Sequence, residues 1–172
     1  CWAVSKQILA RAASFYSLFR INIMPRQLFF QLRPILYVMG ILLLALGATM
    51  IIPAIVDIYH EHVNWETFLT SGFLTCFVGG VLMLTNRSNL SNLGLKHTYV
   101  LTTMSWIVMA AFAAIPLHYG IVDFPYTDAY FEAVSGLTTT GASAIPDVES
   151  LSHGLKLWRI ILHFLGGIGI IV

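Results

Sequence analysis

Three long stretches without a charged residue constrain this chain more than any other feature. Residues 34–56, 67–86 and 97–122 contain 23, 20 and 26 residues respectively, and none of them is Asp, Glu, Lys or Arg. A helix needs about 20 mostly apolar residues to cross a bilayer. Only 10% of the whole chain is charged, whereas a soluble domain carries roughly 25%. We therefore predict an all-α polytopic membrane protein with spans near 34–56, 67–85 and 97–118.

The charge balance and the two cysteines argue against several other kinds of partner. A formal net charge of +1 provides no basic surface for a nucleic acid. Cys1 and Cys76 have neither the spacing of metal ligands nor that of a disulfide framework. We expect Cys76, in the middle of a span, to be a small apolar packing residue. The lipid bilayer is the expected partner, and no cofactor is implied.

The distribution of charge between the spans predicts which ends face the cytoplasm. Residues 1–33 carry five Lys or Arg residues and no acid, and the link 86–96 carries two and no acid. The connectors 57–66 and 119–132 each carry three acids and no Lys or Arg. Because cytoplasmic loops are enriched in Lys and Arg, we predict a cytoplasmic N-terminus and external acidic connectors.

The two ends of the sequence suggest a piece of a longer protein. The chain begins at Cys1 rather than Met, and the apolar run 160–172 has only 13 residues, too few to cross a bilayer. We therefore expect the last helix to be truncated. Met24 is a candidate natural start, so residues 1–23 are either not native or a short amphipathic lead.

The stretch 133–146 does not fit a simple crossing. Its 14 residues include two glycines and a proline, and as a helix they would reach about 21 Å, short of a core about 30 Å thick. We predict a re-entrant segment: a short helix over 128–137 with Thr127 as its N-cap, then an extended polar return. Lys156 and Arg159 in the next connector favour the other interpretation, a crossing to the cytoplasmic side.

The polar return has the chemistry of a cation filter. Non-helical backbone at membrane depth survives only inside protein or along a water-filled path. Three consecutive threonines favour an extended chain, and the following glycine permits the positive φ that turns carbonyls to one side. Such carbonyls can replace the hydration shell of potassium, and the helix C-terminus adds a favourable field. The predicted cation-binding residues are Thr138, Thr139, Thr140 and Gly141, with Ala142 and Ser143 in support.

Two charged residues near this segment are candidates for a supporting role. Glu132 either forms a structural hydrogen bond to the loop or attracts cations to an outer vestibule. We expect Arg159 to snorkel or to pair with a loop acid such as Asp147 or Glu149, and a direct role in the ion path is the alternative.

Three runs of sequence in this region are similar to one known family. The runs DAYFEAVSGLTTTGAS (128–143), LWR (157–159) and LGGIGII (165–171) resemble the transmembrane subunit of Trk-type bacterial potassium uptake systems. The likeness covers nearly everything after the first 23 residues. His163-Phe164 stands where such proteins often carry Gln-Trp, which puts the packing there in doubt.

The resemblance implies an architecture and partners. In this family an N-terminal hairpin precedes four helix–pore-loop–helix repeats, each of which supplies a quarter of one filter. Residues 34–96 then correspond to the hairpin, 97–172 to an incomplete first repeat, and Thr138 to Gly141 to the first filter strand. Relatives form homodimers in the bacterial inner membrane and dock a cytosolic nucleotide-binding regulatory subunit. One strand cannot surround an ion, so conduction is expected of the full-length parent.

Two other functions stay open on the sequence alone. A non-conducting membrane stub is one. The other is an intramembrane hydrolase with Ser143 as nucleophile and His118, His153 or His163 as base. A hydrolase also needs an oxyanion hole, and nothing in the spacing specifies the base. The chain is therefore not predicted to be an enzyme.

Overall fold

The computed structural model describes residues 26–87 and 95–171, and every element within them is a helix. Most of the basic lead and of the link 86–96 lies outside these residues. The chain divides into two units between Leu32 and Arg33, and the architecture below is that of the second unit. The helices in chain order are α2 (Arg26–Thr49), α3 (Ile51–Tyr59), α4 (Trp65–Thr85), α5 (Leu95–Gly120), α6 (Tyr126–Leu137) and α7 (His153–Ile171).

Three helical segments are long and apolar enough to cross a membrane, as the uncharged stretches predicted. They are Arg33–Tyr59, Trp65–Thr85 and Tyr99–Gly120. The first consists of α2 from Arg33 onward and of α3, which are separated at Met50. Pro53 lies three residues beyond this break, and a proline has no N–H to donate to the preceding turn. The helix extends beyond the predicted span 34–56 at its N-terminal end, because α2 begins at Arg26 and contains Pro34 in its interior.

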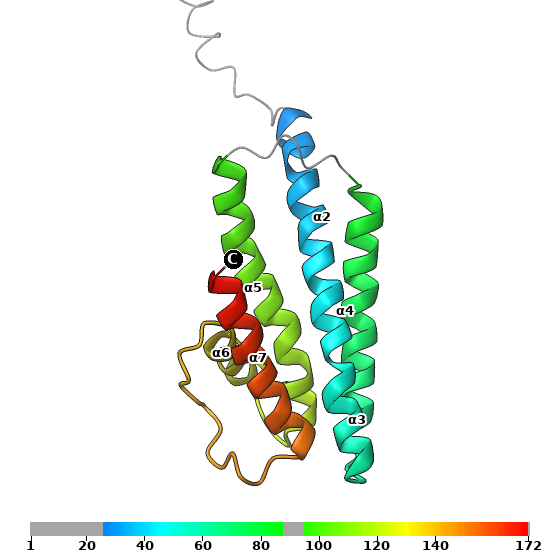
Figure 1. Cartoon of the computed structure of the whole chain (residues 1–172), viewed down its shortest axis with the longest axis vertical. Coiled ribbons are helices and arrows are strands. Elements are labelled where there is room, and N and C mark those ends of the chain that lie inside the picture. The colour runs from blue at the N-terminus through cyan, green and yellow to red at the C-terminus, as the bar shows by residue number, and fades with distance from the viewer. Residues whose placement is uncertain (1–25, 88–94, 172) are drawn as a thin grey trace, which may run out of the picture. The chain divides into compact units, whose positions relative to one another are not determined.

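Helices α2 and α4 pack side by side through glycines (Figure 1). A Cβ added at Gly40 would lie 2.7 Å from the carbonyl oxygen of Gly79, and one added at Gly79 would lie 2.9 Å from that of Gly40. Seven residues along each helix, Gly47 faces Gly72 and Cys76 in the same way. Small residues let two backbones approach closely where lipid provides no hydrophobic drive for association. Cys76 is thus the packing residue that the sequence predicted.

The second half of the unit packs around α7. Trp158 of α7 is fully buried, and its indole N–H donates to the carbonyl oxygen of Ala113 in α5 at 3.0 Å. Its ring makes an edge-to-face contact with Phe68 of α4, with ring centroids 6.2 Å apart. Helix α6 lies between α5 and α7, with Ala129 and Ala133 buried. One aromatic side chain therefore joins the hairpin helix α4 to both long helices of the second half.

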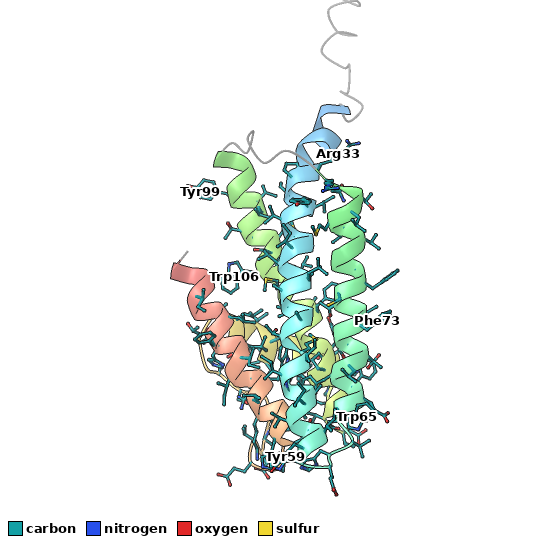
Figure 2. The ribbon with its side chains drawn as sticks, turned by 45° about the vertical axis from the view of Figure 1, so that its right-hand side comes forward. Arg33, Tyr59, Trp65, Phe73, Tyr99 and Trp106 are labelled. Atoms are coloured by element: carbon teal, nitrogen blue, oxygen red, sulfur yellow. The ribbon has the colours of Figure 1, made fainter. Side chains whose placement is uncertain are left out.

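The outward faces of the helices are apolar. Phe73 points away from the bundle on α4, and its side chain is 74% exposed (Figure 2). Tyr59 and Trp65 lie at one end of the unit, and Arg33 and Tyr99 lie at the other (Figure 2). Lipid-facing aromatic residues and aromatic side chains near span ends are typical of helices in a bilayer.

The glycine contact between α2 and α4 can be tested with adjacent residues. We expect Gly79→Leu to lower the free energy of unfolding by about 1–3 kcal/mol, because the new side chain meets backbone atoms of α2. Gly80→Leu is the matched control, since a Cβ at Gly80 has no atom within 4 Å. The measurement is the midpoint of unfolding in detergent, and equal midpoints for the two variants would contradict the packing.

Candidate functional site

Helix α6 is short, and the chain turns back after it. It runs from Tyr126 to Leu137, with Pro125 at the N-cap and Asp128 in its first turn, so the prediction of Thr127 as N-cap is wrong. The ring of Pro125 fixes the φ angle at the residue that precedes the helix, and no side chain caps the helix. Residues 138–152 are not helical, and they return to the end of the bundle where α7 begins (Figure 1).

The three threonines end the helix in a Schellman motif rather than in an extended strand. The Thr139 N–H donates to the carbonyl oxygen of Gly136, and the Thr140 N–H donates to that of Ser135, each at 3.0 Å. Thr138 has φ −80° and ψ 1°, and Thr139 has a left-handed φ of 57°. This geometry satisfies helix carbonyls that would otherwise lack donors. The predicted extended conformation is therefore wrong for Thr138 and Thr139.

Thr139 carries backbone strain. A β-branched residue with positive φ is a rare outlier, and the left-handed conformation costs about 1–2 kcal/mol. The two hydrogen bonds of the Schellman motif contribute about 1 kcal/mol each, which is enough to hold Thr139 there. Strain of this kind clusters at functional sites.

The loop contains four consecutive exposed residues whose carbonyl oxygens accept no hydrogen bond in the described structure. Thr138, Thr139, Thr140 and Gly141 are all exposed. Across the described part of the loop, no donor is hydrogen-bonded to their carbonyl oxygens. Gly141 has φ 76° and no atom within 4 Å of a Cβ position. The four predicted ion-binding residues therefore present acceptors at the C-terminal, negative end of α6.

The loop is fastened to α6 directly after these carbonyls. The hydroxyl of Ser135 donates to the carbonyl oxygen of Ala142 at 2.5 Å. The hydroxyl of Thr138 lies 2.9 Å from that of Thr140. The carbonyl oxygen of Ala142 thus already accepts a hydrogen bond, unlike the carbonyl oxygens of the four preceding residues in the described structure. Nothing in the sequence singled out Ser135 for this role.

The carboxylate of Glu132 connects α6, the loop and α7. It accepts hydrogen bonds from the Ala144 N–H at 2.9 Å and from the Ser143 hydroxyl at 3.1 Å. Arg159 of α7 donates from Nε to its Oε1 at 2.6 Å, and Nη2 of the same guanidinium forms an ion pair with that oxygen at 2.5 Å. The expected hydrogen bond from Glu132 to the loop is confirmed. Arg159 pairs with Glu132 rather than with Asp147 or Glu149.

Burial makes this ion pair strongly dependent on both partners. The side chain of Glu132 is 3% exposed and that of Arg159 is 18% exposed. Taking two charges out of water is costly unless each is paired and hydrogen-bonded, and removal of one partner typically costs 3–5 kcal/mol. Because Glu132 also has two donors from the loop, its charge is fully satisfied.

Helix α7 lies against the end of α6 through a glycine. A Cβ at Gly166 would overlap the carbonyl oxygen of Leu137 at 1.8 Å. Gly136 of α6 similarly faces Leu162 of α7, with a Cβ separation of 3.0 Å. Any larger residue at Gly166 would move α7 away from the last turn of α6, where the exposed carbonyls begin.

The three histidines considered as a base for Ser143 have other partners. Within the described residues no histidine is hydrogen-bonded to Ser143, whose hydroxyl donates to Glu132. The ring of His118 bonds to the carbonyl oxygen of Phe124, and that of His163 bonds to the carbonyl oxygen of Arg159. None of the three candidate histidines therefore contacts the candidate nucleophile in the described structure, and the carboxylate that does contact it, Glu132, is paired with Arg159.

His153 instead belongs to a cluster at the end of the bundle. Its ring stacks on that of His60 with centroids 4.0 Å apart, and the ring of His62 lies 5.8 Å away. The charge of His60 is the main cause that lowers the pKa of His153 from its usual 6.5, and desolvation, Lys156 and His62 act in the same direction. Asp57 opposes them. This pairing joins α7 to the connector after α3.

The helices and the polar turn-back segment define a polytopic helical membrane protein. The family model described as "TrkH: Cation transport protein" matches residues 64–172. The chain therefore belongs to the TrkH family of cation transport proteins.

Individual relatives extend the match across most of the chain. Over 139 residues it is 39% identical to the Trk system potassium uptake protein TrkI of Halomonas elongata, covering 81% of this chain and 28% of that protein. It is 32% identical to TrkH of Escherichia coli over 141 residues, which cover 81% of this chain and 29% of that protein. An uncharacterized cation transporter of Methanocaldococcus jannaschii is 35% identical over 138 residues, which cover 80% of this chain and 29% of that protein. The chain thus spans less than a third of these relatives' length.

The ion pair generates a prediction about stability. Glu132→Gln should lower the free energy of unfolding by about 3–5 kcal/mol, because Arg159 keeps its charge without a carboxylate. Asp128→Asn, one turn earlier on α6, is the control and should change it by less than about 0.5 kcal/mol. Unfolding in detergent provides the measurement. Equal effects of the two substitutions would contradict the role of Glu132.

The histidine cluster generates a prediction about pH. Because the folded-state pKa of His153 lies below 6.5, the unfolded state binds more protons as the pH falls through that value. The contribution of this residue to stability is therefore full above about pH 6.5 and is lost below it. We expect His153→Gln to flatten the dependence of Tm on pH between about pH 7.5 and pH 5. Parallel pH profiles for both proteins would refute this.

Proposed function

We propose that this chain is part of a potassium uptake transporter and that Thr138 to Gly141 form one strand of its ion filter. The observation that carries the proposal is the run of exposed residues at the C-terminal end of α6 whose carbonyl oxygens have no hydrogen-bond donor in the described structure. Membership of the TrkH family supports cation transport, and two named relatives are potassium uptake proteins. The bound species is the transported ion itself.

The chemistry of the loop fits a weakly hydrated cation. Backbone carbonyls can replace a hydration shell without carrying a full charge, so the ion can enter and leave. The negative end of α6 adds attraction along the same direction. Glu132 and Arg159 neutralise each other, so in this proposal they hold the loop and do not bind the ion.

A single loop provides ligands from one side only, so the filter needs further strands. In the proposal these come from the rest of a longer transporter, of which this chain matches 28–29% in its relatives. We also propose a homodimer and a cytosolic nucleotide-binding regulatory subunit as partners. Both follow from the family resemblance, and no residue of this chain identifies the contact.

The proposed location is the bacterial inner membrane with a cytoplasmic N-terminus. The distribution of charge supports it, because the two connectors 57–66 and 119–132 are acidic and the residues flanking the spans elsewhere are basic. These connectors lie at one end of the unit (Figure 1). By this assignment the filter loop enters from the external side.

Substitution of Gly141 tests the filter. The experiment uses a chimera in which this chain replaces the matching 139-residue segment of the Halomonas elongata relative, expressed in cells that lack potassium uptake. We expect Gly141→Val to abolish growth at limiting potassium, because a β-branched residue resists the φ of 76° and redirects the carbonyls. Growth rate and rubidium uptake are the measurements.

Two further results separate the alternatives. Gly80→Val is the control, since its surroundings are open, and it should leave growth unchanged. A chimera that inserts in the membrane but never transports potassium would favour a non-conducting stub. A serine hydrolase would lose all activity in Ser143→Ala, whereas a filter of backbone carbonyls should largely tolerate that change.

A further inference from the structure

Asp57 is a fully buried acid at the end of the first hairpin helix, and it contacts the start of α7. It lies in α3 and has no exposed surface. Its Oδ1 accepts a hydrogen bond from the Gly154 N–H at 2.7 Å, and its Oδ2 accepts one from the Ser152 hydroxyl at 3.1 Å. These contacts connect residues almost one hundred positions apart in the sequence.

The contact acts as an N-terminal cap supplied by another helix. The first N–H groups of a helix lack internal partners, and a carboxylate there is favoured by the helix dipole. Asp57 bonds Gly154 in the first turn of α7, while the Ser152 hydroxyl accepts from the Leu155 N–H at 3.3 Å. A buried carboxylate without donors would be strongly unfavourable, so Asp57 fixes where α7 begins.

Gly154 makes this contact possible. A Cβ at Gly154 would lie 2.4 Å from Oδ2 of Asp57 and 2.8 Å from Oδ1. Only a glycine therefore lets the carboxylate reach the helix terminus. The contact can be disturbed from either side, by removing the charge of Asp57 or by adding one methyl group to Gly154.

Polar contacts at the two ends of one stretch of α7 link Asp57 to the loop that carries Thr138 to Gly141. Arg159 lies five residues after Gly154 on α7, a rise of about 7.5 Å. It holds Glu132, and Glu132 holds the Ala144 N–H, three residues beyond Gly141. The position of α7 along its axis therefore sets where Arg159 can hold the carboxylate and the loop.

We propose that Asp57 is a positioning residue for the ion-binding loop: by fixing the N-terminus of α7, the hairpin sets the geometry of the filter strand and hence its preference for potassium over sodium. This inference rests on the proposed function. Asp57 contacts no ion and acts through Gly154, Arg159 and Glu132.

The test measures ion preference and protein amount separately in the chimera described above. We expect Asp57→Asn and Gly154→Ala to lower the ratio of potassium to sodium uptake about 2- to 30-fold, the range for residues coupled to a site through packed contacts. The controls are Glu66→Gln, an exposed acid, and Gly80→Ala, a glycine with open surroundings. Both should keep the wild-type ratio.

The outcomes distinguish a positioning role from a structural one. If the Asp57 and Gly154 variants reduce only the amount of transporter in the membrane and keep the ratio, the proposal is overturned. Should Asp57→Asn yield too little protein, Ser152→Ala decides, because it removes one bond to the carboxylate and keeps the charge. A Gly141→Val chimera with normal uptake would overturn the filter itself. If Gly141 matters and these residues do not, only the positioning role fails.

Discussion

The loop after α6 depends on the hydrogen bonds and the ion pair that the carboxylate of Glu132 makes. A chain that leaves a helix loses its regular backbone hydrogen bonds, and its buried polar groups then need other partners. Glu132 supplies acceptors to the Ala144 N–H and the Ser143 hydroxyl, and Arg159 pairs with that carboxylate and holds it in place. Because these donors follow Thr138 to Gly141 in the chain, the loop is held on its return path, while the carbonyl oxygens of those four residues have no donor in the described structure.

The sequence predicts the features that depend on local composition. Uncharged stretches located the three candidate spans, and the shortness of 133–146 predicted a brief helix before a non-helical return. Both follow from length and hydrophobicity alone. Thr138 and Thr139 were predicted wrongly, because the preference of threonine for extended backbone is weaker than the need of the last α6 carbonyls for donors.

Contacts between distant segments could not be predicted in this way. Arg159 had nearer acids in sequence, and only the packing of α7 on α6 brings it to Glu132. Asp57 looked like an ordinary acid at the end of a span, and its burial depends on Gly154 almost one hundred residues later. A signal was present in retrospect, since an acid at the apolar end of a helix needs a partner.

The two buried acids have a common geometric consequence for α7. Apolar packing is non-directional, so helices joined only by Leu and Ala side chains can slide or rotate at small cost. Asp57 fixes the first turn of α7, and the pairing of Glu132 with Arg159 fixes a point farther along the same helix. Two fixed points determine both the axial position and the rotation of a rigid helix. In this position Gly166 lies directly against the backbone of Leu137. A displaced α7 would lose this contact. Replacing either acid by an apolar residue could preserve the packed volume, yet it would remove the directional constraint that the loop requires.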